Sequence, residues 1–153
     1  MAEEVAEIFS KHIFSSKYED LSEKTIKQLK VFLLDTIGVG IAGSTGSKLN
    51  ELKKIAHTWS KGKNCTVLGT WDKFSRDAST LINAYQIHCL EFDCIHEGAV
   101  VHPMAAILSS LLAHCEEINN LGHHTNGKEF LISLALGVDI ASSPVKLLSF
   151  NIT

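Results

Sequence analysis

The stretch LSEKTIKQLKVFLLDTIGVGIAG, residues 21–43, decides the fold class of this chain. Its apolar residues recur at steps of three or four, which places them on one face of an α-helix. These residues are Ile26, Leu29, Leu33, Ile37 and Ile41. Ser22 is suited to the N-cap and Gly43 to the C-terminal end. We therefore predict a long buried helix in this stretch, in which Asp35 has a structural role.

The same spacing predicts further helices on both sides of this stretch. Their expected ranges are about 5–13, 47–59, 75–90, 103–120 and 128–141. In the second of these we expect Leu49, Ile55 and Trp59 to face inward. Residues 65–68 form the one β-like run. The sequence therefore predicts an all-α fold of about six helices with one minor short strand.

Composition and charge argue against several classes of partner. The formal net charge of the 153 residues is -3, and the lysines are spread over predicted helix surfaces, so no nucleic-acid partner is expected. No run of about 18 apolar residues occurs, so no membrane span is expected. The acidic start MAEEVAEIF lacks the basic region of a signal peptide. We expect reduced cysteines and a cytoplasmic protein, with a mitochondrial location as the open alternative.

The length suits a single domain, which we assign to residues 1–141. The last residues, SSPVKLLSFNIT (142–153), are an atypical end for a domain. Pro144 stops the preceding helix, and the apolar residues after it need a surface to pack on. We therefore expect this tail to mark a truncated chain.

The reactive side chains concentrate in HCLEFDCIHEGAVVHP, residues 88–103. The segment holds His88, Glu91, Asp93, Cys94, His96, Glu97 and His102. Charged groups between apolar helices are costly to bury unless they are paired or used. Pro103 is suited to the first position of a helix, which puts His102 at its N-cap. The free N–H groups of such a helix start favour a bound carboxylate.

Three interpretations of this segment compete. In the first, the acids and imidazoles pair with one another and cap helices. In the second, Asp93, Cys94, His96 and His102 bind a metal ion, although their spacing matches no standard zinc motif. In the third, the segment binds a carboxylate, and an Asp or His removes a proton from the adjacent carbon. Periodicity does not decide among them.

Residues 83–117, NAYQIHCLEFDCIHEGAVVHPMAAILSSLLAHCEE, resemble the signature region of the MmgE/PrpD family. The shared pattern is Asn-Ala, a His, an acidic-aromatic-Asp step, a His, and His-Pro opening a helix of small and aliphatic residues. Two more segments match in the expected order, LLDTIGVGIAGS (33–44) and GKEFLISLALGVDIA (127–141). The family includes 2-methylcitrate dehydratase, cis-aconitate decarboxylase and iminodisuccinate epimerase.

The resemblance implies a large helical domain with a smaller α+β lid domain, usually in a homodimer. This chain corresponds to the N-terminal part of the helical domain, roughly the first third of a full-length member. The implied chemistry is proton transfer next to a carboxylate of a small di- or tricarboxylate. Loss of water, loss of CO₂ or reprotonation follows, with no metal and no other cofactor.

The resemblance also assigns roles to residues. Asp93 matches the second acidic residue of the acidic-aromatic-acidic step, and His102 matches the His of the His-Pro pair. Both are therefore expected to be catalytic. Glu91 and His96 match neighbouring family positions and are expected, together with His102, to bind substrate.

Two departures from the family pattern favour a divergent, epimerase-like subgroup. Cys94 stands where dehydratase- and decarboxylase-like members usually have Asp, and Ile95 stands where they have Thr. The family also places a further catalytic His, a Lys and a Tyr beyond residues 127–141. We therefore expect a fragment that is inactive alone. The alternative hypothesis is a non-catalytic helical interaction module or a truncated pseudo-enzyme.

Overall fold

The computed structural model describes residues 4–143, and the prediction of an atypical tail at 142–153 lies almost wholly outside them. The described part contains α1 (Val5–Ser15), α2 (Glu23–Ala42), α3 (Leu49–Trp59), α4 (Arg76–His88), α5 (Pro103–Asn120) and α6 (Gly127–Ser142). It also contains two 3-10 helices, η1 (Tyr18–Asp20) and η2 (Gly43–Thr45), and two strands, β1 (Cys65–Thr66) and β2 (Lys73–Phe74). The predicted all-α class is confirmed.

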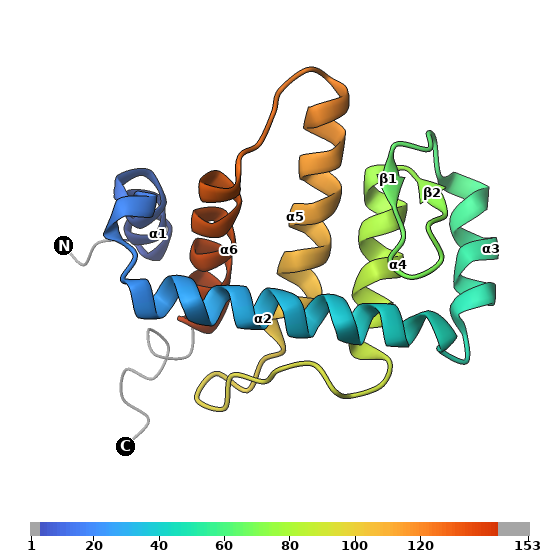
Figure 1. Cartoon of the computed structure of the whole chain (residues 1–153), viewed down its shortest axis with the longest axis horizontal. Coiled ribbons are helices and arrows are strands. Elements are labelled where there is room, and N and C mark those ends of the chain that lie inside the picture. The colour runs from blue at the N-terminus through green and yellow to red at the C-terminus, as the bar shows by residue number, and fades with distance from the viewer. Residues whose placement is uncertain (1–3, 144–153) are drawn as a thin grey trace.

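Helix α2 lies across the ends of the other long helices. In Figure 1 it runs horizontally beneath α6, α5, α4 and α3, and it contacts α4, α5 and α6 directly. Its start is set by Ser22, whose hydroxyl accepts a hydrogen bond from the N–H of Thr25 at 3.1 Å. Its end is at Gly43, as predicted.

Only one face of α2 is buried, which corrects the prediction of a buried helix. Leu29, Thr36 and Gly40 are buried, whereas Leu34 and Asp35 are exposed. Periodicity identified the inward face for Ile26, Leu29, Leu33 and Ile37, which are buried or half-buried, but Ile41 was placed there wrongly, since it is 42% exposed.

Helix α3 and the hairpin after it also differ in part from expectation. Leu49 and Ala56 are buried, but Ile55 and Trp59 are exposed, so the inward placement of these two was wrong. The single predicted strand has a partner, because Cys65 lies opposite Phe74 in an antiparallel pair. Two residues are too few for a detectable alternation, so β2 gave no sequence signal.

Two buried amides of α4 tie the hairpin and α2 to this helix. The Asn83 side chain accepts from the N–H of Leu68 and donates to the carbonyl of Thr66, both at 2.9 Å. Gln86 donates to the carbonyls of Gly40 and Leu68, at 3.1 and 2.9 Å. Buried backbone groups must be paired, and these amides pair those that the short sheet leaves free.

The core has two parts, which meet along α4 and α5. One lies between α3, the hairpin and α4, and includes Leu49, Val67, Phe74 and Ile82. The other lies between α2, α5 and α6, and includes Leu29, Met104, Leu108, Leu131 and Leu134. Because α4 packs along α5, the C-terminal end of α4 and the N-terminal end of α5 are held near each other.

Over residues 4–143, no helix taken singly has the length and apolar character to cross a membrane. Residues 23–45 and 49–59 meet those criteria only as a pair, across a bend of 95°.

A matched pair of glycine substitutions, one inside α2 and one at its C-cap, tests the packing of this end of α2 against α4. A Cβ at Gly43 would overlap the backbone carbonyl of Gln86, whereas a Cβ at Gly38 meets nothing within 4 Å. We expect Gly43→Ala to lower the free energy of unfolding by about 1–3 kcal/mol, because backbone cannot move aside cheaply. Gly38→Ala should raise it by about 0.5–1 kcal/mol through helix propensity. Urea unfolding followed by circular dichroism measures both, and equal effects would contradict the packing described.

Candidate functional site

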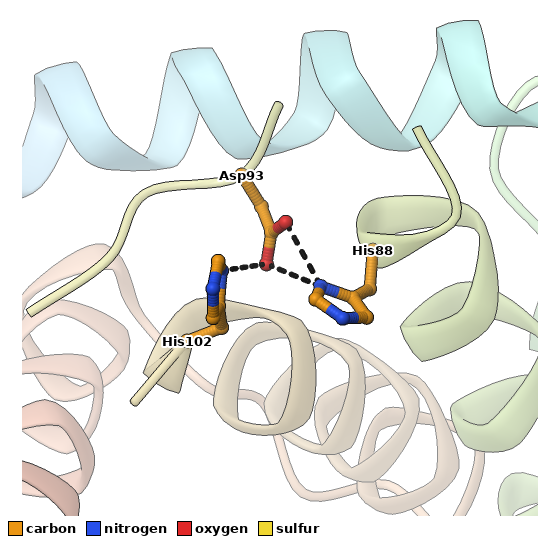
Figure 2. Close-up of side chains that lie close together, drawn as sticks. All are labelled: His88, Asp93 and His102. Atoms are coloured by element: carbon orange, nitrogen blue, oxygen red, sulfur yellow. Dashed lines mark hydrogen bonds and ion pairs between the residues drawn. The ribbon is translucent and has the colours of Figure 1, made fainter. Parts of the chain in front are cut away.

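The centre of the candidate site is the carboxylate of Asp93, whose side chain is 0% exposed. Figure 2 shows it between two imidazoles. His88 Nδ1 lies 3.0 Å from Oδ1 of Asp93 and 3.3 Å from Oδ2. His102 Nδ1 lies 3.2 Å from Oδ2. Three residues that are up to 14 positions apart in the chain therefore form one cluster.

Different elements supply the three side chains. His88 is the last residue of α4, His102 is the N-cap of α5, and Asp93 lies in the connecting segment 89–102. This segment turns sharply, since Glu91 and Val100 have φ values of 55° and 53°. Positive φ is unfavourable for a β-branched residue such as Val100, so the surrounding structure must hold it there.

Burial makes the charge of Asp93 the main electrostatic feature of the cluster. A buried carboxylate must be compensated by hydrogen bonds or by positive charge. Within residues 4–143, its ion-pair partners are His88 and His102, without a lysine or arginine. His88 is the better aligned of the two. The Nδ1 atom of His102 is buried and close to the carboxylate but is not aligned for a hydrogen bond there.

The imidazole rings of His88 and His102 are also neighbours. Their centroids are 4.8 Å apart, and the planes meet at 67°. The first turn of α5 begins with Pro103, and no side chain caps its N–H groups. A helix start without a side-chain cap offers donors to an anion. The cluster and the start of α5 together could therefore hold a carboxylate, relay a proton or bind a cation.

The structure brings some of the predicted site residues together and separates others. Asp93 and His102 are adjacent. Glu91 is exposed, with Oε1 3.6 Å from Nε2 of His88, so it borders the outer side of that imidazole. The described contacts of His96 are made outside the cluster. Its ring accepts a hydrogen bond from the N–H of Ala99 at 3.1 Å, and its backbone N–H donates to the carbonyl of Val101 at 2.9 Å.

His96 lines a separate cavity of about 430 Å³ between α1, α2 and α6. The walls of this cavity include Leu29, Phe32 and Leu136, and none of Asp93, His88 and His102 belongs to them. The substrate-binding role expected for His96 is thus not supported by proximity to the cluster.

Sequence reasoning placed His88 in the reactive segment but gave it no role. In the structure, its imidazole makes the best-aligned contact with Asp93. The available signal was position, because a His at the predicted C-terminal end of one helix can face the start of the next when the two helices pack together. That packing was not known from the sequence.

Cys94, next to the cluster, is a poor nucleophile in this setting. Partial burial raises the pKa of its thiol above the ordinary value, and the negative charges of Asp35 and Asp93 raise it further. The thiolate is the reactive form, so a raised pKa leaves little of it at neutral pH. The four cysteines are free thiols in the structure.

Comparison with known proteins gives one family and several relatives. The family model for the MmgE/PrpD N-terminal domain matches residues 7–152. The cis-aconitate decarboxylase-like protein oryM of Aspergillus oryzae is 26% identical over 126 residues, covering 80% of this chain and 26% of that protein. The cis-aconitate decarboxylase of Homo sapiens is 26% identical over 141 residues, covering 92% and 29%. That of Mus musculus is 25% identical, covering 92% and 28%. The chain thus spans less than a third of the length of these relatives.

Alkylation kinetics test the environment of Cys94. We expect iodoacetamide to modify Cys94 slowly at pH 7.5, because the raised pKa keeps the thiol protonated, and faster as the pH increases. Asp35→Asn should speed the reaction, since it removes a negative charge that opposes ionisation. Peptide mass spectrometry gives the rate at each cysteine. Asp77→Asn is the matched control, because Asp77 is exposed and pairs with Arg76. Equal rates in the two variants would refute this account.

Proposed function

Because the chain belongs to the MmgE/PrpD family, we propose that its described part forms one wall of a pocket for a small di- or tricarboxylate, in a lyase or epimerase. One observation carries the proposal. The buried carboxylate of Asp93 faces the imidazoles of His88 and His102 at the start of α5. An acid, two titratable rings and a helix N-terminus meet at one place.

Binding of the substrate is assigned to the start of α5 and His102. The N–H groups of the first turn and the helix dipole favour a carboxylate at this end. The His102 ring is 31% exposed, so it can contact both Asp93 and a bound anion. We propose that Glu91 contacts the substrate beside the His88 ring, which it borders. His96 lines a separate cavity, so a contact with the same substrate is not part of this proposal.

Proton transfer is assigned to the pair formed by His102 and Asp93. A base beside a bound carboxylate can remove the proton from the adjacent carbon. When His102 accepts that proton, the neighbouring carboxylate of Asp93 stabilises the resulting imidazolium, since opposite charges at 3.2 Å in a buried site attract strongly. Asp93 thereby assists the proton transfer while its side chain stays buried.

The substrate proposal follows the relatives. Those compared are named cis-aconitate decarboxylases or are described as like them, so cis-aconitate is the first compound to test. The residues at 94 and 95 favour an epimerase-like reaction instead, and for this reason the step after proton transfer is proposed only as lyase or epimerase chemistry. A homodimer, as in full-length members, is part of the same proposal.

Binding of cis-aconitate to the chain tests the proposed wall directly. In NMR spectra of the 153-residue protein, we expect cis-aconitate to shift the ring signals of His88 and His102 and the amide signals of Met104 and Ala105. The ring of His12, which pairs with Asp139 between α1 and α6, is the internal control. The trimethyl ester should cause no shift, because it lacks the charge. Shifts at His12 alone would count against the site.

Turnover by the isolated chain is expected to be negligible. Catalytic groups that act as a unit lose most of their effect when some are missing, and the resemblance places a further His, a Lys and a Tyr after residues 127–141. Assays with cis-aconitate, 2-methylcitrate and iminodisuccinate measure this. Turnover that disappears in His102→Ala would show that the expectation of inactivity is wrong while supporting the proposed role of His102.

A second candidate function is a non-catalytic interaction module. The observation in its favour is the exposure of apolar side chains on α2, where Val31 is 50% and Leu34 is 76% exposed. Exposed apolar surface of sufficient size often marks a binding face. The NMR experiment separates the two candidates, because an interaction module has no reason to bind cis-aconitate at His102.

A further inference from the structure

We propose that the cavity between α1, α2 and α6 is the docking site of residues 145–152 of this same chain. The cavity has a volume of about 430 Å³, and the side chains that α6 contributes to it run from Ile132 to Ser142. Residues 144–153 lie outside the described part of the chain and follow almost directly on the end of this lining. None of the three side chains around Asp93 lines the cavity, so this docking is independent of the proposed function.

The walls of the cavity are largely apolar and are incompletely covered by the described residues. On α6 the lining residues recur at steps of three or four along one helix face, and they include Ile132, Ala135 and Leu136. Helix α1 borders the same space but has no buried residue. It is joined to α6 by the pair of His12 Nε2 and Asp139 Oδ2, which are 2.7 Å apart. Apolar walls beside unfilled space lose packing contacts, which favours an apolar occupant.

Ser142 provides a second, independent observation at the C-terminal end of the cavity. Its side chain lines the cavity, and its Oγ is buried without a hydrogen-bond partner within residues 4–143. Buried hydroxyl groups are normally hydrogen-bonded, because an unpaired one has lost its contacts with water without compensation. A backbone group of a segment that enters the cavity beside Ser142 would supply the missing partner. The orphaned hydroxyl therefore favours a polypeptide over a purely apolar ligand.

The segment after Pro144 has the composition that such a cavity requires. It reads VKLLSFNIT (145–153), and Lys146 carries its single charged side chain. Apolar and polar residues alternate in its second half, which is typical of an extended segment with one apolar side. The apolar residues are Leu148, Phe150 and Ile152, and the polar ones are Ser149, Asn151 and Thr153. The family match continues through residue 152, so the segment belongs to the same domain as the helices.

The size of the cavity and the reach of the segment agree with this assignment. An apolar cavity of about 150 Å³ can hold a benzene molecule, so about 430 Å³ has room for roughly two or three side chains such as Leu148, Phe150 and Ile152. The face of α6 from Ile132 to Ser142 is about 15 Å long, at about 1.5 Å per residue. An extended chain advances about 3.3 Å per residue, so residues 145–152 can run back along this whole face.

Paired aspartate substitutions in the 153-residue chain test the docking with matched added charge. Leu148→Asp/Phe150→Asp should lower the urea midpoint of unfolding and raise the fluorescence of the dye ANS. The reason is that buried, unpaired carboxylates are unfavourable, so the segment leaves the cavity and exposes its apolar walls. Ser149→Asp/Asn151→Asp adds the same charge on the other side of the segment and should leave both readings close to those of the unchanged chain. Circular dichroism checks that the helices are retained. Equal effects of the two pairs overturn the proposal.

NMR spectra of the unchanged chain identify the occupant directly. We expect nuclear Overhauser contacts between the ring of Phe150 and the methyl groups of Leu29 and Leu136. The ring of Phe14, which is 88% exposed on α1, is the internal control and should show no contact with Leu136. A sample that mixes isotope-labelled and unlabelled chains separates contacts within one chain from contacts between two copies. Contacts found only between copies, or no contact of Phe150 with the cavity, would refute docking within one chain.

Discussion

The burial of one carboxylate constrains the whole end of the molecule where α4 meets α5. Asp93 cannot stay in the interior as an unpaired charge, so the segment 89–102 must bring it to the two imidazoles at the helix ends. The same segment turns sharply at Glu91 and Val100, which have positive φ values. Apolar packing also holds the connection in place, since Ala99 is buried and Cys94 packs against the core.

Helix α4 links this end to the rest of the fold. Asn83 and Gln86 bind backbone groups of the hairpin and of α2, and two residues after Gln86 the same helix ends at His88. The buried amides thus set the position of α4, and the position of α4 sets the position of the His88 imidazole. A substitution in the hairpin contacts could move the site without touching it, because the ring and the amides share one rigid helix.

The proposed role of the cluster depends on the buried charge of Asp93. This carboxylate can stabilise a proton on His102, because it supplies negative charge in a place with little water, where electrostatic interactions are strong. The chain spans less than a third of the length of the compared relatives, so any pocket built on this wall also needs groups from elsewhere.

The sequence alone determined the features that depend on neighbouring residues. Ser22 and Gly43 mark the ends of α2, Pro103 marks the start of α5, and the motif around Asp93 and His102 points to one family and one reactive segment. Only the tertiary structure decided which helix faces are covered by another part of the chain. Asp35 and Trp59 are exposed and His88 faces Asp93, because periodicity shows which residues share a side of a helix but carries no information on what packs there.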